Sequence, residues 1–432
     1  MGKGGRKMIF VEFLISMFGL LLVGVPIAIA ILGTVAILIL TTGLSNFTLI
    51  PTYLFSGTNS FAMMAVPFFM LAGEIMNEGE LSAGIVGFCR TLLGHVKAGL
   101  GYVAVLACMM FACVSGAAVA TVSAIGGIML PMLMGEGYDK DDSTAIICAG
   151  SITGPIIPPS IPMVLFGTIS GVSVTRMFVS GVIPGVIAGL LVMVTWKLMS
   201  RKKDYKVLKR ASFKEVLISG KQALPCLIMP VIMMGGMLTG IFTPTEAGVV
   251  AVVYAFFVAA FVNKKMSVAT LKKCMVNAAK SSAVVMFIVA TTTALAAIIT
   301  VAQIPQVIAA GLSAISKNPL VIMCLINLII LVIGLVMDVI PAISIVGPIF
   351  LPIVKALGID PTVFGVTMIF GLVIGLLTPP VGAVLYIGCS MGDVPLFRLV
   401  KKILPLVLVY IAILFLLTIF PGIITFLPDL VM

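Results

Sequence analysis

The sequence predicts an all-α polytopic membrane protein made of two inverted-topology repeats, with about 11 transmembrane helices and two re-entrant helical hairpins. Three observations favour this fold class. Of the 432 residues, 61% are hydrophobic and 9% are charged, whereas about 25% are charged in an average soluble domain. Apolar stretches of about 20 residues, the length that crosses a bilayer core, recur from Met8 onward. Glycines and prolines of the first half also recur in the second half at one constant offset.

The formal net charge of +11 does not indicate a nucleic-acid partner. The positive residues lie in short clusters between the apolar stretches, and few aromatic residues lie among them. Such clusters are typical of the cytoplasmic loops of a multi-pass membrane protein. We therefore expect the lipid bilayer to surround the chain, and we expect no nucleic acid to bind it.

The constant offset divides the chain into residues 1–221 and residues 222–432. Pro379 follows Pro158 by 221 residues, and the same spacing relates many other positions without a gap. The matched pairs include Ser123 and Ser344, Gly126 and Gly347, Pro131 and Pro352, Gly150 and Gly371, Gly154 and Gly375, Pro159 and Pro380, and Gly167 and Gly388. Repeats of this length are typical of transporters with duplicated halves.

Lys and Arg counts predict that the two halves have opposite orientations in the membrane. The linker 201–221 carries eight Lys and Arg residues and should be cytoplasmic, whereas its counterpart at the C-terminus carries none. Likewise, the basic loop 398–402 corresponds to a first-half loop whose only basic residue is Arg176. The N-terminal MGKGGRK, with Lys3, Arg6 and Lys7, breaks this scheme. We expect that segment to be partly non-native.

Each half is predicted to contain a re-entrant hairpin followed by an interrupted span. The hairpins are expected near residues 100–134 and 320–354, and the broken helices near 142–168 and 363–390. The stretch from Gly154 to Pro162 contains four prolines, and Gly375 to Gly382 contains a second Pro-Pro pair. Proline lacks a backbone donor and clashes with the preceding turn, so a helix opens at these positions.

Opened helices in a membrane predict ion binding. Freed carbonyls in hydrocarbon cost several kcal/mol unless they are satisfied, and carbonyls at helix C-terminal ends bind Na⁺ while helix N-terminal ends favour anions. Two symmetric breaks therefore predict two cation sites that flank one anion site. The alternative is a pair of proline kinks that serve only helix packing.

The hairpin tips supply further candidates. Ser115, Gly116 and Ala117 are small, which permits close approach of the backbone to a ligand. Asp338 lies at the second tip as an intramembrane acid, and it could bind ligand or simply cap a helix. Five other acids, Asp139, Asp141, Asp142, Asp360 and Asp393, lie near predicted loops and are expected to be solvated. The substrate-binding candidates are Ser115, Gly116, Ala117, Ser160, Asp338, Pro341 and Gly382.

Four motifs resemble the large permease subunit of tripartite ATP-independent periplasmic (TRAP) transporters. The most specific one, FTPTEAG, lies within the stretch GGMLTGIFTPTEA at residues 235–247. The others are PFFMLAGEIMNEG at residues 67–79, PPSIPMVLFG at residues 158–167 and TPPVG at residues 378–382. The resemblance covers essentially the whole chain.

This resemblance implies an elevator-type secondary transporter of the bacterial inner membrane and not an enzyme. It implies Na⁺-driven import of a small organic anion, such as sialic acid or a C4-dicarboxylate. It also implies two protein partners, a small four-helix membrane subunit and a periplasmic substrate-binding protein. The family's cation sites use mainly backbone carbonyls of a hairpin tip and of the neighbouring helix break.

Carried onto this sequence, the resemblance implies two Na⁺ sites. The first would involve Ser115, Gly154, Ile157 and Pro159, and the second Gly334, Gly375, Thr378 and Val381. The repeat supports this assignment because Gly154 and Ile157 correspond to Gly375 and Thr378. However, Gly334 corresponds to Cys113 and not to Ser115.

Three other functions remain open at this point. A stand-alone Na⁺/carboxylate symporter would have similar hairpins and would need no binding protein. An intramembrane aspartyl protease could use Asp338 and Asp393, although Asp393 lies beside a basic loop. An ion channel would not require a Na⁺ gradient for flux.

Overall fold

Every regular element in the described part of the chain, residues 3–432, is a helix in the computed structural model. Side chains are described from Met8 onward, so those of Lys3, Arg6 and Lys7 lie outside the described part. Eight of the described helices are long and apolar enough to cross a membrane, or nine if a bent pair is one span. The predicted all-α polytopic class is confirmed.

The described part of the first half, from residue 3 onward, contains ten α-helices and one short 3₁₀ helix. In chain order these are α1 (Lys3–Leu22), α2 (Ile27–Thr42), α3 (Leu49–Thr58), η1 (Ala62–Met64), α4 (Ala65–Glu78), α5 (Leu81–Leu93), α6 (Gly99–Ser115), α7 (Ala118–Gly135), α8 (Lys140–Ser151), α9 (Ile161–Ser170) and α10 (Val174–Ser200).

The second half contains ten α-helices and one short π-helix. These are α11 (Phe213–Leu238), α12 (Pro244–Phe257), η2 (Val258–Val262), α13 (Val268–Val301), α14 (Ile304–Ile315), α15 (Pro319–Val336), α16 (Val339–Ala356), α17 (Pro361–Gly375), α18 (Ala383–Gly392), α19 (Leu396–Ile419) and α20 (Gly422–Val431).

The helices of the two halves correspond at the offset seen in the sequence. Helix α7 covers residues 118–135 and α16 covers residues 339–356, so both ends differ by 221. The hairpins α6–α7 and α15–α16 correspond in the same way, as do the pairs α8–α9 and α17–α18. Each such pair is interrupted by a non-helical segment, 152–160 or 376–382, that holds the Pro-Pro pair.

Ion pairs between loops show that the two interrupted pairs run antiparallel. Lys140, at the start of α8, lies 2.8 Å from Asp393, at the end of α18. Arg176, just after α9, lies 3.5 Å from Asp360, at the start of α17. The beginning of one interrupted pair therefore lies beside the end of the other. We call the end with Lys140 the linker face and the end with Arg176 the opposite face.

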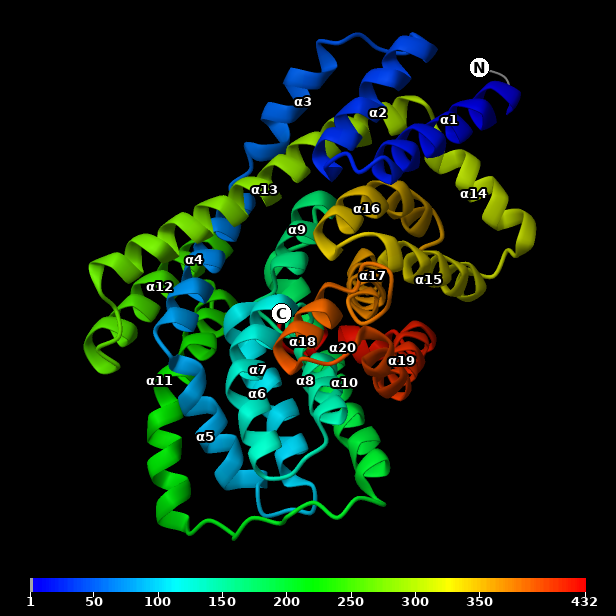
Figure 1. Cartoon of the computed structure of the whole chain (residues 1–432). Helices are drawn as coiled ribbons and strands as arrows, with labels where there is room; N and C mark the ends of the chain where they lie inside the picture. Colours follow the sequence, from blue (N-terminus) through cyan, green and yellow to red (C-terminus); the bar gives the residue numbers. More distant parts are fainter. Residues whose placement is uncertain (1–2) are drawn as a thin grey trace.

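The two repeats interlock around their breaks (Figure 1). Helix α9 packs against α16 and α18 packs against α7, so each half-helix that follows a break contacts the hairpin of the other repeat. Helices α8 and α10 likewise contact α19 and α17. Outside this unit, α4 packs on α12 and α13, and α13 also packs on α2, α3 and α16. The crossed contacts hold both breaks inside one packed unit.

The linker is shorter than the sequence predicted. Helix α11 begins at Phe213, so the second part of the expected linker 201–221 is helical. A capping box starts this helix, because the Ser212 hydroxyl accepts from the backbone N–H of Glu215 while the Glu215 carboxylate accepts from Ser212. Such a box satisfies donors that a helix start leaves unpaired. The linker crosses the bottom of the view in Figure 1.

Candidate functional site

The first hairpin tip lies directly against the first break. Gly116, with φ +60°, approaches the carbonyl of Pro159 so closely that a Cβ on Gly116 would clash with it. A Cβ on Gly154 would lie 2.9 Å from the carbonyl carbon of Ala117. Only glycine permits these backbone approaches. The structure therefore brings Gly116, Ala117, Gly154 and Pro159 together.

The second tip meets the second break in a similar way. A Cβ on Gly375 would clash with the carbonyl of Gly334 and would lie 2.8 Å from its Cα. The backbone N–H of Val381 donates to the carbonyl of Leu335 at 3.3 Å, which joins tip and break directly. The Thr378 hydroxyl donates to the carbonyl of Gly375 at 3.1 Å.

Most carbonyls of the predicted cation ligands have no hydrogen-bond donor among the described residues. This holds for the carbonyl oxygens of Ser115, Gly154, Ile157, Pro159, Gly334, Thr378 and Val381, whereas that of Gly375 accepts from Thr378. No group of three or more His, Cys, Asp or Glu side chains in the described residues is placed to hold a metal. Main-chain oxygens are thus the donor set at the breaks, and oxygen donors suit a hard cation.

Helix ends add to the electrostatics of both sites. The C-terminal ends of α6 and α8 meet at the first site, and those of α15 and α17 meet at the second. Each helix C-terminus carries about half a negative charge and each N-terminus about half a positive charge. The N-terminal ends of α7, α9, α16 and α18 follow immediately after the same segments. Both breaks therefore place cation-attracting and anion-attracting ends side by side.

The two breaks differ in accessibility. All residues from 151 to 160 are buried, whereas Pro379 and Pro380 are exposed. The Ser160 hydroxyl is engaged, because it caps α9 by accepting from the N–H of Met163 and donates to the carbonyl of Pro155. The Ile157 side chain lies against Gly185 of α10. In this conformation the second break is open and the first is closed.

The remaining substrate-binding candidates lie at the second tip. Asp338 is exposed and is the N-cap of α16, where its carboxylate accepts from the N–H of Val339 at 2.8 Å. Pro341 is buried in the first turn of that helix, and Gly382 is buried at the start of α18 with φ +27°. Asp338 is therefore the accessible side chain of this group.

A cavity of about 320 Å³ lies beside the site, between α3, α9, α13 and α16. Its lining is rich in hydroxyl groups, which sequence reasoning did not single out. The lining residues are Ser56, Gly57, Ser60, Thr168, Ile169, Val289, Thr292, Thr293, Ala296, Ser344 and Pro348. A run of three threonines at 291–293 within an apolar helix was the signal available in the sequence.

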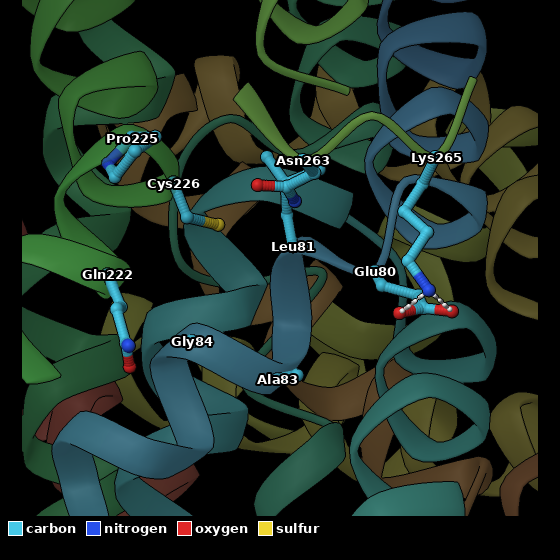
Figure 2. Close-up of a pocket in the computed structure, with 9 residues that line it drawn as sticks. All are labelled: Glu80, Leu81, Ala83, Gly84, Gln222, Pro225, Cys226, Asn263 and Lys265. Carbon is cyan, nitrogen blue, oxygen red and sulfur yellow. Dashed lines mark hydrogen bonds and ion pairs between the residues drawn. The ribbon is translucent and has the colours of Figure 1, made fainter. Parts of the chain in front are cut away.

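A second cavity, of about 310 Å³, lies away from both breaks, between α5, α11 and the turn before α13 (Figure 2). The Lys265 ammonium binds both carboxylate oxygens of Glu80, at 3.2 and 3.0 Å. Asn263 donates to the carbonyl of Gly79 at 2.9 Å. The charged groups at this cavity therefore pair with each other. We assign the cavity to the packing contact between α5, α11 and the turn before α13.

The expectation that Asp142 is a solvated loop acid was wrong. Its side chain is only 4% exposed, and its carboxylate pairs with Lys203 of the linker and with Lys402 of α19, the latter at 2.8 Å. Tyr205 donates to it at 3.2 Å and stacks on Tyr138 with ring centroids 4.0 Å apart. Burial raises the pKa of Tyr205 to about 12, so its hydroxyl stays protonated at neutral pH. The cluster fastens the linker to both repeats.

An aspartyl dyad of Asp338 and Asp393 does not fit this arrangement. The Asp393 side chain is 97% exposed and pairs with Lys140, which lowers its pKa. Helix α18 separates Asp393 from Gly382 by ten residues, a rise of about 15 Å. Gly382 follows Val381, which is bonded to the second tip. The two acids thus lie at different depths.

Comparison with known proteins assigns the family. The family described as the DctM component of the tripartite ATP-independent periplasmic transporter matches residues 14–423. The chain belongs to this family. A relative from Escherichia coli, the 2,3-diketo-L-gulonate TRAP transporter large permease protein, is 38% identical to this TRAP permease and covers 97% of both chains. The resemblance read from the motifs is confirmed.

Other relatives of this TRAP permease carry different names. The sialic acid large permease of Vibrio cholerae is 33% identical over 95% of this chain and 96% of its own length. The C4-dicarboxylate large permease of Pseudomonas aeruginosa is 36% identical over 87% and 88%. The crystal structure of the Alcanivorax borkumensis YdaH transporter is similar in fold, with a TM-score of 0.62 and 16% identity over 86% and 88% of the two chains.

The most specific motif of the family has a structural role in this chain. Thr243 of FTPTEAG caps α12, and the Glu246 carboxylate accepts from the N–H of Thr243 at 2.7 Å, which forms a capping box. The Thr245 hydroxyl donates to the carbonyl of Phe61 at 2.8 Å, and Gly248 packs on Phe68 of α4. The motif therefore fixes the start of α12 against α4.

Proposed function

We propose that this TRAP permease is the large membrane subunit of a Na⁺-coupled importer of a small organic anion in the bacterial inner membrane. One observation carries the proposal. Seven of the eight carbonyls predicted as cation ligands accept no hydrogen bond from the described residues, and they lie where hairpin tips meet broken helices. Carbonyls without partners in a membrane protein line a cavity or bind an ion.

Charge and geometry support Na⁺ as the ion. The ligand set is neutral backbone oxygen, and the convergent helix C-terminal ends add partial negative charge without a carboxylate. Moving one charge through about 100 mV yields about 2.3 kcal/mol. Two or more Na⁺ therefore offset the inward movement of one anion and still drive its accumulation. The two equivalent breaks account for two Na⁺ sites.

The partners follow from the family. We propose a small four-helix membrane subunit and a periplasmic substrate-binding protein as components of the same transporter. The exposed apolar side chains on α11, α12 and α13, among them Leu224, Val253 and Val284, give this subunit a large surface for lipid and for a membrane partner. An elevator movement of the interlocked breaks and hairpins past these helices is the proposed mode of transport.

Reconstitution tests the proposal. The large subunit, the small subunit and the binding protein are combined in proteoliposomes, and uptake of a radiolabelled carboxylate is measured with an inward Na⁺ gradient. We expect uptake only when all three components and Na⁺ are present. Uptake that persists when K⁺ replaces Na⁺ would refute the coupling.

The main alternative is a stand-alone Na⁺/carboxylate symporter. The same assay separates the two, because that function predicts full uptake by the large subunit alone. Uptake by the large subunit alone would still depend on Na⁺. This outcome would therefore contradict the proposed partners and leave the proposed cation sites unaffected.

A further inference from the structure

Most hydroxyl groups that line the cavity between α3, α9, α13 and α16 already donate their hydrogens within their own helices. Thr168, Thr292 and Ser344 each donate to a carbonyl of their own helix, at 2.9, 2.7 and 3.0 Å respectively. Thr293 donates to the carbonyl of Val289 at 2.9 Å. A hydroxyl has one hydrogen and two lone pairs. Thr168 and Thr293 are the partly exposed members of this set, so with their hydrogens committed they offer acceptors to the cavity.

The backbone of α16 adds one further acceptor. Pro348 lines the cavity and is partly exposed. Its carbonyl lacks the usual helix partner, because Pro352, four residues later, has no N–H to donate. Acceptors therefore come from both the side chains and the main chain.

The chemistry of this wall selects hydrogen-bond donors that carry no negative charge. Asp, Glu, Lys, Arg and His are absent from the cavity lining among the described residues. A carboxylate is acceptor-only and would meet the acceptors of Thr168, Thr293 and Pro348; among the cavity hydroxyls of the described residues, the Ser60 hydroxyl is the one that donates to no other group. Most of the charge would stay unpaired at a cost. Alcohol groups donate and fit such a wall. The volume of about 320 Å³ suffices for a small organic molecule.

The position of the cavity relates it to the anion-attracting helix ends. Thr168 lies eight residues after Ser160 on α9, and Ser344 lies six residues after Asp338 on α16. These separations correspond to about 12 Å and about 9 Å along the two helices. A ligand whose carboxylate lies at the N-terminal ends of α9 and α16 would place its far end in this cavity.

We propose that the cavity binds the hydroxylated tail of the transported acid and makes this TRAP permease prefer polyhydroxylated monocarboxylates over dicarboxylates. This inference rests on the proposed function, because it assumes that the anion lies at the breaks. Thr168 of α9 and Thr293 of α13 are its central residues, because both line the cavity and both are partly exposed.

Ligand-induced thermal stabilisation of the full purified chain tests the proposal. The probes are gluconate, which carries five hydroxyls on a six-carbon acid, hexanoate, which lacks them, and succinate, each titrated in Na⁺ and in K⁺. For the wild type we expect gluconate to bind at least about tenfold more tightly than hexanoate or succinate, in Na⁺ only. Several hydroxyl hydrogen bonds of about 1 kcal/mol each account for that ratio.

Two variants of matched shape localise the effect. Thr293→Val removes a partly exposed cavity hydroxyl and should weaken gluconate binding about three- to tenfold, with succinate unchanged. Thr291→Val is the control, because Thr291 lies on the same helix, also donates to a carbonyl of that helix, and is buried away from the cavity lining. It should leave gluconate binding unchanged.

The outcomes separate this inference from the proposed function. Equal Na⁺-dependent stabilisation by all three acids, or equal effects of Thr291→Val and Thr293→Val on gluconate, would contradict tail binding in this cavity and leave Na⁺ coupling intact. Stabilisation by the acids that is identical in Na⁺ and K⁺ would instead contradict the proposed function itself.

Discussion

At the scale of single residues, the account depends on backbone oxygens and on the glycines that let them converge. The sequence predicted most of these positions because proline and glycine act locally: a Pro-Pro pair opens a helix wherever it stands. It did not predict which groups would be hydrogen-bonded. Gly375 differs from the other predicted ligands because its carbonyl accepts from both the backbone N–H and the hydroxyl of Thr378, in a local turn that no sequence pattern fixes.

Thr378→Ala should weaken Na⁺ binding at the second site. The Thr378 hydroxyl donates to the carbonyls of Gly375 and Ile374, so its loss loosens the turn that holds the predicted ligands Gly375 and Thr378 in place. We expect the half-saturating Na⁺ concentration for uptake to rise about tenfold, the equivalent of one or two hydrogen bonds. Thr367→Ala is the control, because Thr367 makes the same pair of contacts within intact α17. An unchanged Na⁺ titration in Thr378→Ala would count against the second site.

Gly375→Ala should separate the second tip from its break. The added Cβ meets the backbone of Gly334, which cannot move aside as a flexible side chain can. Overpacking costs about 1 to 3 kcal/mol or more. We expect Na⁺-dependent uptake to fall by at least about tenfold. Gly87→Ala on α5 points into open space and should transport normally; equal uptake by both variants would show that the contact is dispensable.

At the scale of helices, the most specific family motif turned out to form a cap and not a ligand site. Motif recognition identified the family, but it could not assign a role to FTPTEAG, because capping and ligand binding both favour Thr and Glu at such spacing. The structure decides between them. The Glu246 carboxylate accepts from the backbone N–H and the hydroxyl of Thr243 at the start of α12.

Thr243→Ala should therefore lower stability without changing ion affinity. Loss of an N-cap hydroxyl costs about 1 kcal/mol, which should appear as a lower thermal unfolding midpoint. The half-saturating Na⁺ concentration should stay at the wild-type value. Ser212→Ala, at the equivalent capping box of α11, should behave in the same way. A shift in Na⁺ affinity with Thr243→Ala alone would place this motif at the transport site.

At the scale of the whole molecule, the internal offset of 221 residues predicted the correspondence of helices, and the Lys and Arg counts predicted their antiparallel arrangement. It could not anticipate how the linker is held. Asp142 resembled an ordinary loop acid because its partners, Lys203 and Lys402, are distant in sequence. The cavity between α3, α9, α13 and α16 was missed for the same reason, since its walls come from four helices that are distant in sequence.

The linker cluster predicts a coupling between the two repeats. Asp142→Asn removes the charge that Lys203 and Lys402 share, and it leaves two ammonium groups facing one another. Breaking a fully buried pair costs about 3 to 5 kcal/mol; the cost here should be smaller because the lysine side chains are 33% and 37% exposed. We expect a lower unfolding midpoint. Lys140→Gln, at the exposed pair with Asp393, should change the midpoint far less.

The most direct measurement of the central claim is equilibrium binding of radiolabelled Na⁺ to the purified chain. The carbonyl sets at the two breaks predict saturable binding of two Na⁺ per chain, with one lost or strongly weakened in Gly375→Ala and with none displaced by K⁺ at equal concentration. Absence of saturable Na⁺ binding to the wild type, or a Gly375→Ala variant that binds Na⁺ as the wild type does, would contradict the account.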